Sequence, residues 1–104
     1  MGITTHVLDT AKGRPAVGVR LVLVRMIDGD EHVLFDGVTD DDGRARLAEH
    51  AEPGTYRLTF DTGSYNPGGF FPEVTIVFTI DGREHHYHVP LLLSPFGYST
   101  YRGS

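Results

Sequence analysis

Histidines carry most of the chemistry that this sequence could perform. Six of them occur in 104 residues, which is many for a chain of this length. His86 and His88 lie two residues apart in "REHHYHVPLLL" (83–93), and His6 lies in "ITTHVLD" (3–9). An imidazole titrates near neutral pH, so it can take a proton from water, or it can bind zinc or copper. The simplest role of any one strand histidine is still that of a surface or hydrogen-bonded side chain.

Arginines are the second group of interest. When a base takes a proton from attacking water, negative charge develops on the substrate, and a guanidinium group stabilises such charge with a fixed fork of donors. The candidates are Arg14, Arg102 and Arg44, which directly follows an Asp-Gly turn. Arg20 and Arg57 lie within expected strands and are interpreted as solvated.

Other catalytic groups are missing from the sequence. It contains no cysteine, no Gly-x-Ser-x-Gly motif and no glycine-rich phosphate loop. Water is therefore the expected nucleophile if the protein is an enzyme. A metal shared by His6, His86 and His88 is the weaker alternative, because no recognised ligand spacing appears. The residues alone are compatible with a hydrolase and leave the other roles open.

Size and charge restrict the class of protein. A chain of 104 residues is expected to form a single domain over 1–104. The net charge of −5 and the lack of a basic face argue against nucleic-acid binding. No apolar stretch approaches the roughly 20 residues that cross a membrane. The first residues lack the basic and then apolar pattern of a secretion signal, so we expect a cytoplasmic protein.

Alternating apolar and polar residues predict β-strands along the whole chain. The clearest run places Val74, Ile76 and Phe78 on one face. Turns with glycine and proline separate such runs, and helix has room only near 48–50 and 62–66. Short strands at this spacing are typical of a two-sheet sandwich. We expect strands at about 3–9, 17–26, 31–37, 44–47, 54–61, 71–80, 83–93 and 97–102.

The same alternation predicts where the histidines point. If Ile3 and Val7 face the core, His6 faces outward together with Thr4. His86 and His88 then lie opposite the apolar face of the stretch 83–93, which consists of Tyr87, Val89, Leu91 and Leu93. The histidines are therefore expected on faces that the core does not use, where they are free for a site or an interface.

Three segments carry a resemblance to a known family. They are "ITTHVLDTAKGRPAVGV" (3–19), "TDDDGRA" (39–45) and "HYHVPLLLSPFGYSTYRGS" (86–104). The sequence resembles the transthyretin-like family over essentially its whole length, and within it the 5-hydroxyisourate hydrolase branch. The resemblance implies an all-β, transthyretin-like (prealbumin-like) β-sandwich of two mainly four-stranded antiparallel sheets, with little or no helix.

The resemblance also implies a function and a site. Its enzyme branch hydrolyses 5-hydroxyisourate to 2-oxo-4-hydroxy-4-carboxy-5-ureidoimidazoline in urate catabolism, as a homotetramer with sites where dimers meet. No metal or other cofactor is expected. Position by position, the family's catalytic residues fall on His6, Arg44 and His88, and its substrate-binding residues fall on Tyr101, Arg102, Gly103 and Ser104.

One local departure and two alternatives accompany this interpretation. Family members often have a short helix between the fifth and sixth strands, and here the link 62–69 is so short that we expect the helix to be reduced to a turn or missing. A non-enzymatic ligand-binding relative of transthyretin is one alternative. A regulatory-type sandwich module is the other. Neither needs paired outward histidines or the closing "YRGS".

Overall fold

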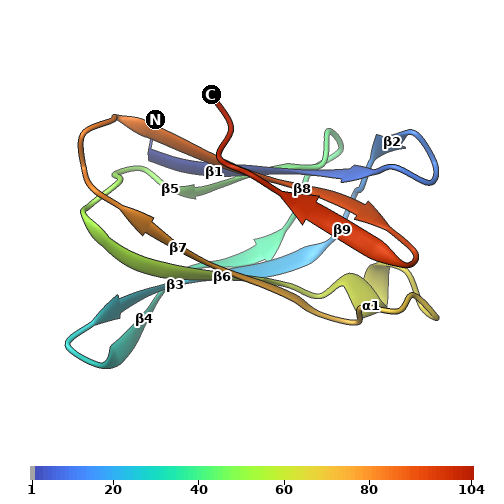
Figure 1. Ribbon diagram of the computed structural model, residues 1–104, viewed down its shortest axis with the longest axis horizontal. Coiled ribbons are helices and arrows are strands. Elements are labelled where there is room, and N and C mark those ends of the chain that lie inside the picture. The colour runs from blue at the N-terminus through green and yellow to red at the C-terminus, as the bar shows by residue number, and fades with distance from the viewer. Residues whose placement is uncertain (1) are drawn as a thin grey trace.

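Two β-sheets packed face to face make up the protein, and one short helix lies at an end of the sandwich (Figure 1). The computed structural model describes residues 2–104. Within these residues the elements are β1 (Gly2–Asp9), β2 (Arg14–Pro15), β3 (Arg20–Ile27), β4 (Asp30–Val38), β5 (Arg44–Ala48), β6 (Gly54–Phe60), α1 (Thr62–Tyr65), β7 (Val74–Ile80), β8 (His86–Ser94) and β9 (Gly97–Thr100). The expected all-β sandwich is confirmed.

The five-stranded sheet differs in one important respect from the expected antiparallel arrangement. Its order is β2-β1-β8-β9, with β5 also pairing with β1, and the central strands β1 and β8 run parallel. The four-stranded sheet has the order β4-β3-β6-β7 and is antiparallel throughout. Neighbouring strands joined by a tight turn must be antiparallel, whereas β1 and β8 are joined by most of the chain, so no turn determines their direction.

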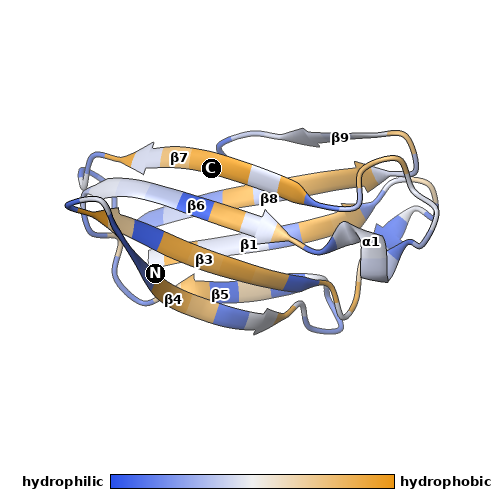
Figure 2. Cartoon of the chain, turned by 90° about the horizontal axis from the view of Figure 1, so that it is seen from below, coloured by the Kyte–Doolittle hydropathy of each residue, from blue (hydrophilic) through white to orange (hydrophobic). Residues whose placement is uncertain are grey.

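The core lies between the two sheets and explains the alternation in the sequence. Ile3 and Val7 of β1 and Leu91 of β8 are fully buried, as are Leu58 and Phe60 of β6. Each such side chain contributes about 1.5–3 kcal/mol by leaving water. In Figure 2 apolar stretches follow the strands, and hydrophilic residues gather in the turns between them. The inward faces of β1 and β8 are those that the sequence predicted.

Helix α1 is a single turn, so the expectation of a reduced helix is confirmed and that of a missing one is wrong. Asp61 caps it by accepting a hydrogen bond from the Ser64 amide. The Tyr65 hydroxyl donates to Asp9 Oδ2 at 2.7 Å, which ties the helix to the end of β1. Burial of Tyr65, together with this bond, raises the pKa of its hydroxyl to about 12. The other helical candidate, 48–50, is not helical.

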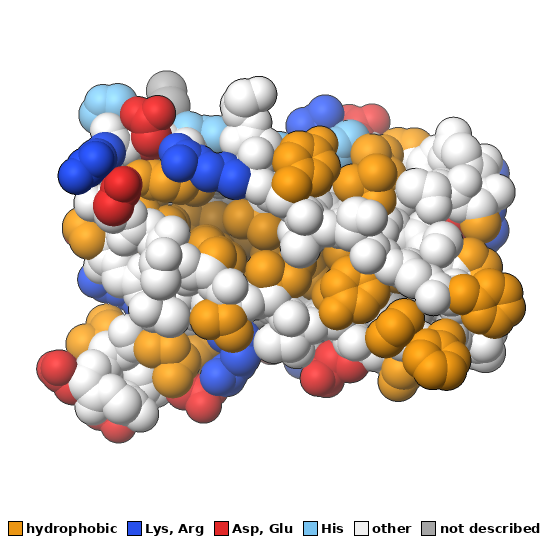
Figure 3. Space-filling model, in the orientation of Figure 1, with side chains coloured by type: hydrophobic (Ala, Val, Ile, Leu, Met, Phe, Trp, Pro, Cys, Tyr) orange, Lys and Arg blue, Asp and Glu red, His pale blue; other side chains and the backbone are white. Residues whose placement is uncertain are grey.

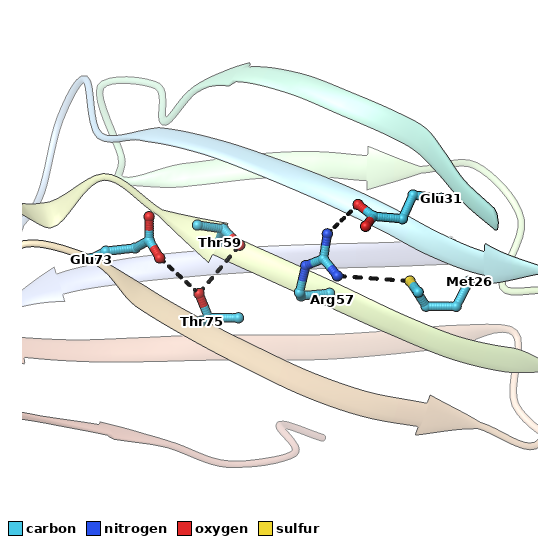
Figure 4. Close-up of polar contacts among 6 residues, drawn as sticks. All are labelled: Met26, Glu31, Arg57, Thr59, Glu73 and Thr75. Carbon is cyan, nitrogen blue, oxygen red and sulfur yellow. Dashed lines mark hydrogen bonds and ion pairs between the residues drawn. The ribbon is translucent and has the colours of Figure 1, made fainter. Parts of the chain in front are cut away.

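Polar side chains on the outer face of the four-stranded sheet contact one another (Figure 4). Arg57 pairs with Glu31, and one of its nitrogens lies 3.9 Å from the sulfur of Met26. On the same sheet Arg20 pairs with Asp36. Both arginines are therefore surface groups, but each is paired with a carboxylate, whereas the sequence interpretation had them simply solvated. Within residues 2–104 no helix has the length and apolarity needed to cross a membrane.

Candidate active site

The parallel pairing of β1 with β8 brings distant histidines onto one face of the five-stranded sheet. In this register Thr4 is opposite His88, and His6 is opposite Pro90. On the other side of β1, the antiparallel strand β5 places Arg44 opposite His6. Paired residues project from the same face of a sheet. Thr4, His6, Arg44 and His88 therefore share the outward face, on the side where Figure 3 shows pale blue histidines along the edge of the molecule.

The turn before β5 fixes the place of Arg44. Asp40 accepts hydrogen bonds at its Oδ1 from the amides of Asp42 and Arg44, both at 2.9 Å. Gly43 has φ 75°, and a Cβ there would lie 2.5 Å from the carbonyl oxygen of Val7. Only glycine allows so close an approach in this conformation. The acidic segment thus works as a turn that holds β5 against β1.

His88 is half-buried and its ring is held by a hydroxyl group. Thr4 Oγ1 lies 2.8 Å from Nδ1 of His88 and 3.0 Å from Nε2 of the exposed His86. Burial is the main cause that lowers the pKa of His88 below its ordinary value, and the charges of His86, Arg44 and His6 add to the shift. His88 is therefore neutral near pH 7, in the form that can accept a proton.

His6 shows a different kind of environment. Its Nε2 is buried and has no hydrogen-bond partner within the described residues. Buried ring nitrogens usually have a partner, and one without is often found at a functional site. A bound substrate or a water molecule could supply the missing bond.

The end of the chain lies against His88. The amide of Gly103 donates to the His88 carbonyl at 2.8 Å and forms an isolated bridge with it. Ser104 then lines a cavity of about 530 Å³ together with Thr4, Arg44, His86 and His88. Two of the four predicted substrate-binding residues, Gly103 and Ser104, are thus brought to the histidine face.

Tyr101 and Arg102 lie elsewhere in the isolated chain. They line a smaller cavity of about 160 Å³ against β7, with Ile76 and Phe78. The Arg102 guanidinium lies over the ring of Tyr87, 5.0 Å from its centre. His88 lines this cavity as well as the larger one, so it is the residue that the two share. Tyr101 and Arg102 therefore lie in the cavity on one side of His88, and Ser104 lies in the cavity on the other side.

Other surface features do not coincide with this site. A larger cavity of about 1120 Å³ lies around the turn after β5, with His50 and Glu52 in its lining, and contains none of the predicted site residues. Within residues 2–104 no three His, Cys, Asp or Glu side chains are grouped so that they could hold a metal ion. The expectation of a metal-free site stays a prediction.

Thr4 and His86 are site residues whose roles the sequence did not reveal. Thr4 was expected on the same face as His6, but nothing in the pattern indicated a contact with β8. His86 was considered as a metal ligand. Its contact with Thr4 joins two residues that are 82 positions apart in the sequence, and it depends on the parallel register of β1 and β8. The signal available in the sequence was spacing: Thr4 lies two residues before His6, and His86 lies two residues before His88, so each pair shares one face of its strand.

Fold and site together define a class of protein, a two-sheet β-sandwich whose outer face is lined by histidine and arginine. Comparison with known proteins identifies the family. The model of the HIUase/Transthyretin family matches residues 3–103. A 5-hydroxyisourate hydrolase of Deinococcus radiodurans is 46% identical over 114 residues, covering 99% of this chain and 96% of the relative. The chain belongs to the HIUase/Transthyretin family.

Other relatives show how widely this domain is used. The uric acid degradation bifunctional protein TTL of Arabidopsis thaliana is 45% identical over 119 residues, which cover 98% of this chain but only 37% of that protein. Among solved structures, the 5-hydroxyisourate hydrolase of Klebsiella pneumoniae has a TM-score of 0.85, 37% identity and full coverage of both chains. Sea bream transthyretin in complex with thyroxine has a TM-score of 0.91, 33% identity and coverage of 99% and 95%. The fold alone therefore does not separate the two branches.

Proposed function

We propose that the protein hydrolyses 5-hydroxyisourate to 2-oxo-4-hydroxy-4-carboxy-5-ureidoimidazoline, as one step of urate degradation. The observation that carries the proposal is the strand register that brings His6, Arg44 and His88 to one face. Relatives with this activity in their names are 46% and 43% identical over almost the whole chain. The reaction adds water to a cyclic amide. It needs a base, a stabiliser for the oxyanion and a proton for the leaving nitrogen.

His88 is the proposed general base. Its depressed pKa keeps the imidazole neutral, and Thr4 occupies Nδ1, so Nε2 is the nitrogen left to take the proton from water. The water oxygen then attacks the amide carbonyl carbon. Because the required form is the deprotonated one, activity falls as pH drops through the pKa of His88.

Arg44 and His6 complete the proposed chemistry. Arg44 is exposed in the histidine cavity, where its guanidinium can hold the carbonyl oxygen as negative charge develops. His6 does not line this cavity and its unpartnered Nε2 is buried, so we propose that a local movement brings it to the substrate ring, which it binds or to which it carries a proton. The amide C–N bond then breaks, the nitrogen takes a proton, and the ring opens to a carboxylate. Ser104 borders the same cavity and is proposed to position the substrate.

A homotetramer is proposed as the active form. Within residues 2–104 the outer edge of β7 has no partner strand. The strand contains no charged residue over Val74–Ile80 and exposes Val77 to 64%. Such an edge favours pairing with a second copy. The face with the histidines also carries half-buried Leu8 and Leu92, which a second pair of subunits can cover. An edge contact and a face contact together generate a closed tetramer.

The remaining expectations stay proposals of the same kind. We propose that residues 1–104 act as a single domain with a small-molecule substrate and no nucleic-acid or membrane partner. The cytoplasmic location expected from the sequence also stays a prediction.

The main rival within the family is a ligand-binding protein without activity. It is favoured by one observation, the TM-score of 0.91 to sea bream transthyretin. The histidine and arginine set argues against it, because binding a ligand does not need a neutral, half-buried base next to a guanidinium group. A regulatory-type module has no use for such a face either.

The proposal is tested by following the ultraviolet absorbance of freshly made 5-hydroxyisourate with and without the protein. We expect the protein to accelerate the decay, and His88→Ala to lower kcat at least about 100-fold, the usual contribution of a general base. His32→Ala, a histidine of the other sheet, is the control and should keep full activity. A chelator should leave the rate unchanged.

Each contrary result has a distinct meaning. An unchanged spontaneous decay rate with the wild-type protein would overturn the hydrolase proposal. Thyroxine binding without any effect on the decay would favour the ligand-binding rival. Full activity of His88→Ala would leave the enzyme but remove the proposed base.

A further inference from the structure

A single hydroxyl group connects two histidines on the outer face of the five-stranded sheet. Thr4 Oγ1 lies 2.8 Å from Nδ1 of His88 and 3.0 Å from Nε2 of His86. The ring centres are 6.3 Å apart and the ring planes differ by 20°. The two imidazoles are therefore side by side and interact through the hydroxyl.

The hydrogen atoms in this group are linked. A hydroxyl has one proton to donate, and a neutral imidazole has one N–H and one free nitrogen. If His88 donates from Nδ1 to Thr4 and Thr4 donates to His86, then Nε2 of His88 is free to accept a proton. If His86 donates to Thr4 and Thr4 donates to Nδ1 of His88, then Nε2 of His88 carries a proton and is an acid. Thr4 thus couples the position of the proton on one imidazole ring to its position on the other.

Building on the hydrolase function proposed above, we propose that Thr4 and His86 form a proton relay behind His88. Thr4 passes the proton, and His86 holds the resulting charge. The relay switches His88 from base to acid within one turnover. Thr4 and His86 are positioning and proton-holding residues, and of the three only His88 exchanges a proton with the substrate and the attacking water.

The steps balance as follows. Nε2 of His88 takes a proton from the attacking water, while the Nδ1–H bond breaks and its proton moves to Thr4. The Thr4 hydroxyl gives its own proton to Nε2 of His86. His88 ends neutral with a proton on Nε2, and His86 ends as the imidazolium. When the amide C–N bond breaks, Nε2 of His88 gives its proton to the nitrogen and the relay runs in reverse.

The environment of the two rings explains the direction of the transfer. His88 is half-buried, whereas His86 is exposed to water, which stabilises a positive charge. Charged and titratable groups lie around His88 on several elements. They are His6 on β1, Arg44 and Arg46 on β5, His86 on β8, Asp40 in the turn before β5, and Arg102 in the smaller cavity that His88 also lines. Moving the positive charge from His88 to His86 takes it away from Arg44, whose own charge lowers the pKa of His88.

The position of Thr4 is determined by the fold rather than by the site. Thr4 pairs with His88 in the parallel register, and the next residue, Thr5, is fully buried and donates its hydroxyl to the Val89 carbonyl at 2.6 Å. This neighbouring bond locks β1 against β8, so the Thr4 hydroxyl cannot drift away from the two rings.

Three variants test the relay. Thr4→Val removes the hydroxyl at nearly constant volume, and we expect kcat to fall about 10- to 100-fold with KM changed less than about twofold. Thr4→Ser retains the hydroxyl and should recover activity to within about threefold. Thr10→Val is the matched control, because the Thr10 hydroxyl also bonds to β8, but to the Leu93 carbonyl and away from the histidines. It should behave as the wild type.

Two readouts separate a relay from mere packing. In mixtures of light and heavy water, the wild-type rate should depend on deuterium content along a curve, since more than one proton moves, and Thr4→Val should give a straight line. In ¹⁵N spectra of the imidazoles, His86 and His88 should titrate as a coupled pair in the wild type. In Thr4→Val the coupling should become weaker and keep only its electrostatic part, because the ring centres stay 6.3 Å apart, and coupling of unchanged strength would overturn the relay.

The NMR titration needs no turnover, so it can fail or succeed separately from the hydrolase proposal. Independent titration of His86 and His88 in the wild type would overturn the relay even in an active enzyme. Unchanged kcat in a folded Thr4→Val variant would overturn it as well. A coupled titration in a protein that does not accelerate 5-hydroxyisourate decay would retain the linked protons and reject the hydrolase function.

Discussion

Gly103 determines how closely the end of the chain approaches His88. A Cβ at this position would lie 2.7 Å from Cδ2 of the His88 ring and 3.3 Å from two further atoms of that side chain. Real side chains do not approach so closely, so any other residue would displace the ring or the tail. The need for glycine here comes from this contact and not from an unusual φ, which Gly103 does not have.

We predict that Gly103→Ala lowers kcat/KM about 10- to 100-fold because it shifts the proposed base. The free energy of unfolding should change by less than about 1 kcal/mol, since the tail is at the surface. Kinetics and thermal unfolding measure the two effects. Gly97→Ala is the matched control, because its Cβ would meet nothing closer than 3.8 Å. Equal activity of both variants would show that the close contact is unimportant.

At the scale of elements, the tail after β9 (Gly97–Thr100) behaves as a separate unit. The expected strand 97–102 ends at Thr100, and beyond it the chain is held by the Gly103 bridge and by Arg102 over Tyr87. The backbone bond contributes about 0.5–1.5 kcal/mol and the cation–π contact about 0.5–1 kcal/mol. The tail therefore adds little to stability and can be removed without unfolding the sandwich.

Deletion of residues 102–104 should remove most of the activity and leave a folded, assembled protein. The reason is that the deletion takes away one wall of the histidine cavity, Ser104, and the contact of Gly103 with His88. We expect kcat/KM to fall more than about 100-fold and the Tm to fall by only about 4–8 °C per kcal/mol lost. Loss of the proposed tetramer on truncation would instead identify the tail as purely structural.

At the scale of the whole molecule, the site is open on one side. The histidine face lies outside the sandwich, and Tyr101 and Arg102 line a different cavity from Ser104 in the single chain. A second subunit over this face would cover the open side of the histidine cavity and supply the rest of its wall. The opposite face of the molecule, by contrast, carries ion pairs and hydrogen bonds within its own surface (Figure 4), beside the exposed Val33 and Val77.

Leu92→Glu should therefore break the proposed tetramer into smaller species and reduce activity together with assembly. Leu92 is half-buried on the outer face of β8, two positions along from Pro90, and a carboxylate there could not be buried without a partner. Sedimentation or light scattering measures the mass, and the absorbance assay measures the rate. The control Val33→Glu places the same charge on β4, where Val33 is 63% exposed, and should leave both unchanged. An intact tetramer in Leu92→Glu would contradict the proposed face contact.

Much of the architecture follows from local patterns. The alternation in β1, β6, β7 and β8 predicted strands and their buried faces, because side chains of a strand alternate between two sides whatever the rest of the chain does. Strand ends were less predictable. The strand expected at 83–93 begins at His86, and the one expected at 17–26 begins at Arg20, where turns decide the pairing.

The residue types that make up the candidate site, and their outward direction, were determined by the sequence itself. Which of them meet was decided only by the tertiary structure. Thr4 and His88 are 84 residues apart, and their contact requires a parallel pairing that no hairpin imposes. The division of the tail between two cavities likewise depends on where β7 and β8 pack. Alternation is a property of one strand, whereas register and proximity arise only when distant strands bury a shared core.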